Sequence, residues 1–113
     1  MHELSIVMNI VEIVEENLQQ SGAKAVTEIE LEIGSLSGVV IEAMEFALEE
    51  GIKNTILEHA RKNIIKIPGR AKCNKCSREF DVDDLFTPCP ECSSFDSTII
   101  QGEELRVKSI VVE

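Results

Sequence analysis

Hydrophobic and polar residues follow one another along the chain in patterns that predict two helices and three strands. Residues 4–21 carry apolar side chains every three or four positions, and Gly22 follows them as a helix stop signal. Residues 40–50 repeat this helical spacing, with Ser37 as a candidate N-cap. Residues 26–33, 61–67 and 104–112 alternate with a period of two, which predicts half-buried strands.

The charges on the three predicted strands indicate how the strands pair. The polar face of the first strand is acidic, whereas the polar faces of the two later strands are basic. The first strand carries Glu28, Glu30 and Glu32, the second carries Lys62 and Lys66, and the third carries Arg106 and Lys108. On the third strand, Leu105, Val107 and Val111 are expected on the opposite, apolar face. Opposite charges on facing strands stabilise pairing and like charges oppose it. We therefore expect one three-stranded sheet with both helices on its apolar face, although the strand order stays open.

Composition and charge narrow the function classes. With 113 residues, 43% of them hydrophobic, the chain allows one compact domain with a small satellite. The net charge of −10 argues against binding of nucleic acid phosphates, and residues 1–60 contribute all of it, with twelve acids and two lysines. No apolar run is long enough for a membrane span and no secretory signal is recognisable, so we expect a cytoplasmic protein. No Ser/His/Asp set or phosphate loop indicates an enzyme.

The four cysteines form the strongest motif. Cys73, Cys76, Cys89 and Cys92 make two C-x2-C pairs separated by twelve residues. Each short pair directs two sulfurs to one point, and two facing pairs build a tetrahedral four-sulfur cage that suits structural zinc. A tetrathiolate iron site and a pair of disulfides remain alternatives. We expect a small zinc-ribbon lobe, inserted before the last strand, in which a closed ligand shell leaves no position for catalysis.

The aromatic residues concentrate in the same lobe. Phe80, Phe86 and Phe95 are three of the four Phe of the chain. Aromatic side chains in a zinc ribbon can stack on nucleic acid bases, but this lobe is not basic. We therefore expect the three rings to form a minimal core around the metal.

The first three residues form a second candidate metal site. The bulky side chain of His2 is expected to prevent removal of Met1, which leaves a free α-amine beside the imidazole. That amine, the imidazole and the intervening amide nitrogen can occupy three corners of a plane, which favours Ni(II) or Cu(II), and Glu3 can add an oxygen. The spacing by itself is a weak signal, since most terminal histidines are solvated. His59, the other histidine, is expected to be solvated.

Several sequence blocks, taken in order over essentially the whole chain, resemble the HypA/HybF family of hydrogenase maturation proteins. They are Met1-His2-Glu3-Leu4-Ser5, Leu31-Glu32-Ile33-Gly34, Leu36-Ser37-Gly38-Val39, Ile67-Pro68-Gly69-Arg70-Ala71, the two cysteine pairs, and Glu104-Leu105-Arg106-Val107-Lys108-Ser109-Ile110. The resemblance implies a nickel metallochaperone that serves [NiFe]-hydrogenase and, in some organisms, urease. It assigns nickel to His2, with Glu3 and the Met1 amine, and zinc to the four cysteines. The alternative is a zinc-ribbon protein-interaction module without nickel transfer.

The element pattern predicts the organisation, and the resemblance adds the metals and the partners. We expect an α+β fold with a nickel-binding domain over residues 1–69 and 98–113 and a zinc-ribbon domain over residues 70–97. The expected partners are a HypB-like GTPase and a hydrogenase large-subunit precursor, and the chain itself is expected to be a monomer or weak homodimer. Two features depart from the family: Ser77 and Ser93 stand where glycine is frequent, and the zinc lobe has no histidine, which leaves the fourth nickel ligand open.

Overall fold

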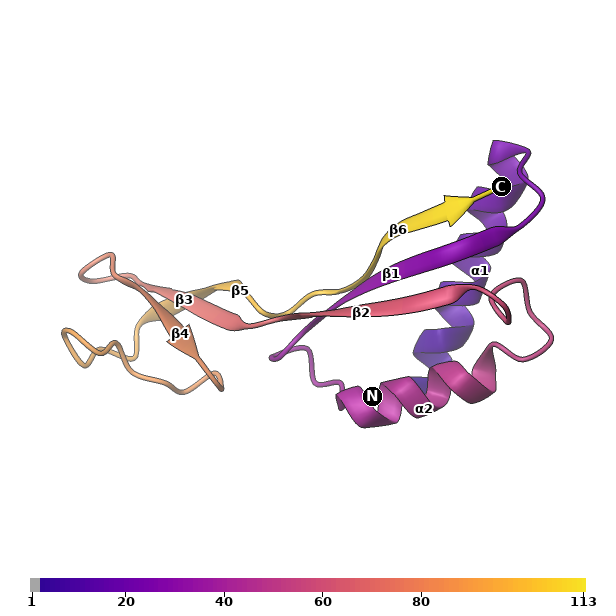
Figure 1. Ribbon diagram of the computed structural model, residues 1–113. Helices are drawn as coiled ribbons and strands as arrows, with labels where there is room; N and C mark the ends of the chain where they lie inside the picture. Colours follow the sequence, from indigo (N-terminus) through magenta and orange to yellow (C-terminus); the bar gives the residue numbers. More distant parts are fainter. Residues whose placement is uncertain (1–2) are drawn as a thin grey trace. The chain divides into compact units, whose positions relative to one another are not determined.

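The computed structural model describes residues 3–113, which form two compact units in an α+β fold (Figure 1). The first unit contains the residues up to Leu31 together with Val39–Ile65 and Arg106–Glu113. The second unit contains Glu32–Gly38 and Lys66–Leu105. The functional division into a nickel-binding and a zinc-ribbon domain stays a prediction.

Two helices belong to the first unit. α1 spans Glu3–Ser21 and α2 spans Ile41–Gly51, close to the predicted ranges. The two helices pack closely at Gly51, where an added Cβ would lie 2.9 Å from Cγ1 of Val7. The prediction of Ser37 as N-cap is wrong: Val40 holds that position and offers no side-chain hydrogen bond, because α2 begins three residues later than a Ser37 cap requires.

The first sheet consists of β1 (Val26–Gly34), β2 (Arg61–Ile67) and β6 (Leu105–Val112), in the order β2-β1-β6. The acidic strand is thus central, with a basic strand on each side, as the charge pattern indicated. Ile29 and Leu31 are buried on the apolar face of β1. On the polar face, the carboxylate of Glu30 accepts hydrogen bonds from Asn63 of β2 (3.4 Å) and Ser109 of β6 (2.9 Å).

The last strand keeps its alternation only at its start. Lys108 and Ser109 are both exposed, so the burial pattern shifts by one residue. Ile110 is therefore half-buried and Val111 is 49% exposed. The expectation that Val111 lies on the apolar face with Leu105 and Val107 is wrong, because a shift of one residue turns a side chain to the opposite face.

A second sheet lies in the second unit and was not predicted. β3 (Gly69–Cys73) pairs antiparallel with both β4 (Glu79–Val82) and β5 (Ser97–Gln101), in the order β4-β3-β5. Ala71 lies opposite Phe80 on one side and Ile99 on the other. Strands of four or five residues give too few alternating positions for recognition by period. The expected zinc-ribbon lobe is therefore built on a sheet of its own.

The core of the second unit is small and includes two cysteines. Ala71, Cys73, Phe80, Val82 and Cys89 are buried together, with Leu36 and Ile99 packed against them. Phe86 and Phe95 are 79% and 72% exposed, so the prediction of a three-Phe core is wrong for both. The cysteine side chains occupy the centre that the aromatic rings were expected to fill.

Three glycines bring backbone segments of the second unit into direct contact. A Cβ on Gly34 would lie 1.9 Å from the carbonyl oxygen of Gly102, and one on Gly102 would lie 2.6 Å from Cα of Gly69. The Leu36 N–H donates to the Gly102 carbonyl at 2.7 Å, and the Leu36 side chain packs on Gly69. Only hydrogen in place of a side chain permits this approach.

Candidate metal centre

Two nearly identical turns carry the four cysteines. In the first, the Cys73 N–H donates to the Arg78 carbonyl at 2.8 Å and the Ser77 N–H donates to the Cys73 carbonyl at 3.0 Å. The second turn repeats both bonds at the same offsets: the Cys89 N–H donates to Ser94 and the Ser93 N–H donates to Cys89, each at 2.9 Å. The two C-x2-C segments therefore form two turns with the same pattern of backbone hydrogen bonds.

The residue after each second cysteine has a left-handed backbone. Ser77 has a φ of 68° and Ser93 a φ of 62°. Glycine adopts this conformation without a Cβ penalty, so the turn geometry favours glycine at both positions. The two serines keep the turn geometry at some conformational cost.

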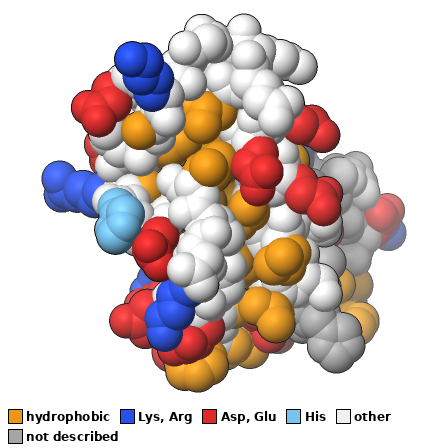
Figure 2. Space-filling view, turned by 90° about the vertical axis from the view of Figure 1, so that its right-hand side faces the viewer, with side chains coloured by type: hydrophobic (Ala, Val, Ile, Leu, Met, Phe, Trp, Pro, Cys, Tyr) orange, Lys and Arg blue, Asp and Glu red, His pale blue; other side chains and the backbone are white. Residues whose placement is uncertain are grey.

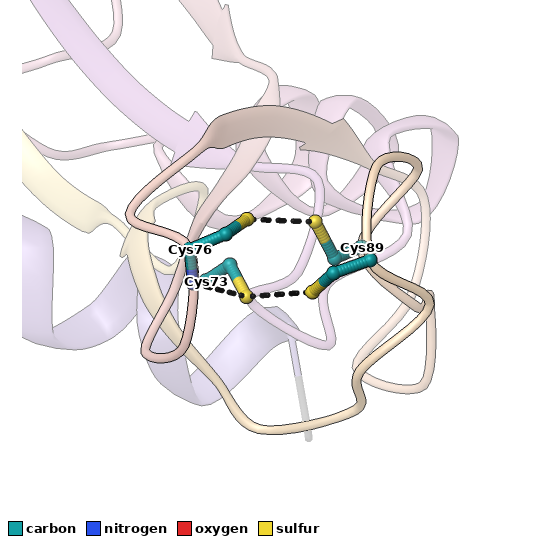
Figure 3. Close-up of side chains that lie close together, drawn as sticks. Cys73, Cys76 and Cys89 are labelled. Atoms are coloured by element: carbon teal, nitrogen blue, oxygen red, sulfur yellow. Dashed lines mark hydrogen bonds between the residues drawn. The ribbon is translucent and has the colours of Figure 1, made fainter.

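The four sulfur atoms converge on one point between the turns (Figure 3). Sγ of Cys73 lies 3.5 Å from Sγ of Cys92, and Sγ of Cys76 lies 3.6 Å from Sγ of Cys89. All four ligand atoms lie within 4.8 Å of one another. A tetrahedral zinc ion with Zn–S bonds of about 2.3 Å separates its sulfurs by about 3.8 Å. The arrangement fits one tetrahedral ion held by four thiolates.

Backbone donors prepare the cluster for negative charge. The N–H groups of Cys76 and Lys75 point at Sγ of Cys73 at 3.5 and 3.4 Å, and together they lower the pKa of that thiol to about 6. The Cys92 N–H likewise lowers the pKa of Cys89. The Arg78 N–H favours the Cys76 thiolate, but desolvation and the neighbouring sulfurs outweigh it and raise the pKa of Cys76 to about 12. Without a metal ion, these pKa shifts favour the thiolate at Cys73 and Cys89 and the thiol at Cys76.

The structure brings together one of the two predicted sites. Cys73 and Cys89 are buried and Cys76 and Cys92 are exposed, all in one cluster. Met1 and His2 lie outside the described residues, whereas Glu3 is the half-buried first residue of α1. The imidazole of His59 is 93% exposed and lies 3.3 Å from a Glu58 carboxylate oxygen, as expected of a solvated histidine.

Sequence reasoning missed two contributors to the cysteine cluster. Leu36 packs on its core from a segment over thirty residues earlier in the chain, and Ile99 packs on it from β5. Gly34 and Gly38, which flank Leu36, indicate a turn, but they do not indicate which segment the turn packs against. Recognition of this contact needed the tertiary structure.

Among residues 3–113, no helix is both long and apolar enough to cross a membrane.

Comparison with known proteins places this architecture in a family. Residues 1–112 match the family described as hydrogenase/urease nickel incorporation, metallochaperone, hypA. The hydrogenase maturation factor HypA of Parabacteroides distasonis is 51% identical over 113 residues, which are 100% of this chain and 98% of the relative. The HypA of Geobacter metallireducens is 46% identical, with complete coverage of both chains.

Solved structures agree with these relatives. The solution structure of a HypA protein matches with a TM-score of 0.73 at 25% identity, over 100% of this chain and 97% of the other. The solution structure of the Ni metallochaperone HypA from Helicobacter pylori matches in fold, with a TM-score of 0.69 over 99% and 97% of the two chains. The full-length match, the two-sheet α+β fold and the four-cysteine cluster agree, and the chain belongs to the HypA family of hydrogenase and urease nickel-incorporation metallochaperones.

Proposed function

We propose that this protein binds Ni(II) at its N-terminus and delivers it during maturation of [NiFe]-hydrogenase, and of urease where the cell makes that enzyme. The observation that carries the proposal is the family match over residues 1–112, which includes the terminal Met1-His2-Glu3. Nickel is the cargo in this scheme, and the protein transfers it without catalytic turnover.

The proposed nickel ligands are the Met1 amine, the His2 imidazole and the amide nitrogen between them, with Glu3 as a further oxygen ligand or hydrogen-bond partner. Planar nitrogen-rich sets favour Ni(II), whereas the bulk carboxylates of the acidic first half do not select for it. Glu3 begins α1, where the helix dipole favours a carboxylate. A chelate at a chain end exchanges its metal readily because few packed side chains hold it.

The proposed role of the four cysteines is to hold structural Zn(II). Four protein thiolates complete a tetrahedral shell, so the ion would stabilise the second unit without an open position for substrate. Cys73 and Cys89 belong to the core of that unit, and metal binding there is coupled to its folding.

The proposed partners are a HypB-like GTPase and the hydrogenase large-subunit precursor, in the cytoplasm. The family's role in hydrogenase maturation supports them, since the cargo has to leave the chaperone for an assembling enzyme.

A nickel titration of the zinc-loaded protein tests the proposal. We compare wild type, His2→Ala and a form with extra residues before Met1, using calorimetry. His2→Ala and the extended form are expected to lose affinity by roughly 100-fold or more, because even outer-shell partners of a metal are worth about 10–100-fold. His59→Ala is the matched control and is expected to bind nickel as wild type does, since His59 is not among the proposed ligands and its imidazole is solvent-exposed.

The outcome separates the two candidate functions. Equal nickel binding by all four proteins would show that the terminal site is wrong. Absence of nickel binding by wild type would favour the zinc-ribbon interaction module instead.

A further inference from the structure

Helix α2 presents one exposed aromatic ring among carboxylates. Phe46 is 66% exposed, and the exposed residues of the same helix are acidic. In an α-helix, positions three and four apart are surface neighbours. Glu42 and Glu50 lie four residues from Phe46, Glu49 lies three residues from it, and Glu45 precedes it. We name these five residues the α2 face.

The ring of Phe46 does not serve the core. The buried side of α2 is formed by Met44, Ala47 and Leu48, which are 0%, 7% and 3% exposed. Phe46 projects from the other side of the helix, so most of its apolar area stays in water. Figure 2 shows one face of the molecule on which hydrophobic side chains lie at the surface between acidic ones. Aromatic side chains are enriched where one protein contacts another.

Three of the four carboxylates are also placed against the helix's own electrostatics, whereas Glu42 lies in the first turn, where the dipole favours it. Glu45 and Glu49 are four residues apart, where like charges repel. Glu49 and Glu50 lie in the last turn, where the helix dipole disfavours negative charge, and that turn contains no basic residue. Among residues 3–113, only Glu50 of the four forms an ion pair, with Lys53 at 3.0 Å. Within the described residues, the repulsion between Glu45 and Glu49 is therefore not offset by an ion pair of either one.

We propose that the α2 face is a docking surface for a protein partner that offers an apolar pocket bordered by Lys and Arg side chains. Phe46 would enter the pocket, and the four carboxylates would face the basic border. Charge complementarity selects this partner over an acidic one, and the surplus of acids in the first sixty residues would speed its approach.

The test uses the two proteins named as partners under the proposed function, the cognate HypB-like GTPase and the hydrogenase large-subunit precursor. Binding of each to the full zinc-loaded chain is measured by interferometry at several salt concentrations. Phe46→Ala is expected to raise the Kd of at least one partner about tenfold or more. Glu45→Gln with Glu49→Gln is expected to lower the association rate about threefold to tenfold at low salt, with the difference fading at high salt.

Phe95→Ala is the matched control, since it removes an equally exposed ring (72%) from the other unit, and it is expected to leave the Kd within twofold. An equal loss from Phe95→Ala, or no effect of Phe46→Ala on either partner, would overturn the proposal. So would failure of both partners to bind wild type, or a loss explained by self-association of the chain in sedimentation. Nickel affinity is measured in parallel, so that failure of the docking surface is distinguished from failure of the proposed nickel function.

Discussion

At the scale of single residues, Ser77 and Ser93 show how the cysteine turns accommodate a residue with a Cβ in a left-handed conformation. Both have a positive φ, and the N–H of each donates to the carbonyl of the first cysteine of its pair, Cys73 or Cys89. A left-handed conformation costs a residue with a Cβ about 1–2 kcal/mol. The turns form regardless, because two backbone hydrogen bonds in each turn hold the loop closed.

Replacement of either serine by glycine is expected to stabilise the protein. Ser77→Gly relieves the backbone strain and loses part of the gain to the greater freedom of glycine in the unfolded chain, so we expect a net gain of up to about 1 kcal/mol. Chemical unfolding of the zinc-loaded protein measures the free energy of unfolding. Lys72→Gly in β3 is the control and is expected to lose about 0.5–1 kcal/mol, since Lys72 is exposed and has no positive φ. Destabilisation by Ser77→Gly would contradict the strain argument.

At the scale of elements, the sheets differ in how the sequence specifies them. The long strand β1 buries Ile29, Leu31 and Ile33 on one face, and its charges select basic neighbours. The short strands of the second sheet depend instead on close backbone contact at Gly34, Gly69 and Gly102. Crowding at these glycines is therefore expected to destabilise the second unit.

Gly34→Ala tests the crowding. The new Cβ would lie 1.9 Å from the Gly102 carbonyl oxygen, so the backbone has to move, and we expect a loss of about 2–4 kcal/mol in thermal unfolding. Gly38→Ala is the matched control: Gly38 has a φ of 84° but no atom within 4 Å of an added Cβ. Its expected loss is about 1 kcal/mol, from the backbone conformation alone. Equal losses from both variants would refute crowding at Gly34 as the cause.

At the scale of the whole molecule, the two units have cores of different chemistry. The buried side chains of α1, α2 and β1 are hydrocarbon apart from Met44, whereas the second core includes two cysteines of the metal cluster. Protonation of the cluster therefore acts on the second core directly, because metal binding requires thiolates.

The pKa directions predict how zinc affinity varies with pH. In the metal-free cluster the pKa of Cys73 is lowered to about 6 and that of Cys76 is raised to about 12. The pKa of Cys92 is also raised: the Ser94 N–H favours the Cys92 thiolate, but the Cys73 sulfur, which accepts the Cys92 S–H as a thiolate, and desolvation outweigh it. At pH 7 zinc binding therefore has to release protons from Cys76 and Cys92, so affinity falls as the pH falls.

Below about pH 6 the Cys73 thiol must lose its proton as well when zinc binds, so zinc affinity decreases more steeply with falling pH. Competition with a chromophoric chelator between pH 5 and pH 8 measures the slope. Calorimetry in buffers of different ionisation enthalpy counts the protons released, and we expect about two to three per zinc ion at pH 7. A zinc affinity independent of pH over this range would contradict the assignment.

The sequence determined the features of this protein that depend on near neighbours in the chain. Hydrophobic periodicity located both helices and the strands of the first sheet. Charge alternation indicated a sheet that pairs acidic with basic strands, and the C-x2-C spacing identified the two metal turns. Each of these signals lies within a few residues, where helix and strand geometry fix which side chains share a face.

Only the tertiary structure decided the features that depend on distant segments. Convergence of the four sulfurs requires β3 and the loop before β5 to meet, and Leu36 reaches the same core from far along the chain. Phe46, Phe86 and Phe95 are exposed because other side chains fill each core. The residue type alone does not predict whether the core has room for a ring. Hydrophobic character tells which side chains gain from burial, but the packing of the whole unit determines which of them are buried.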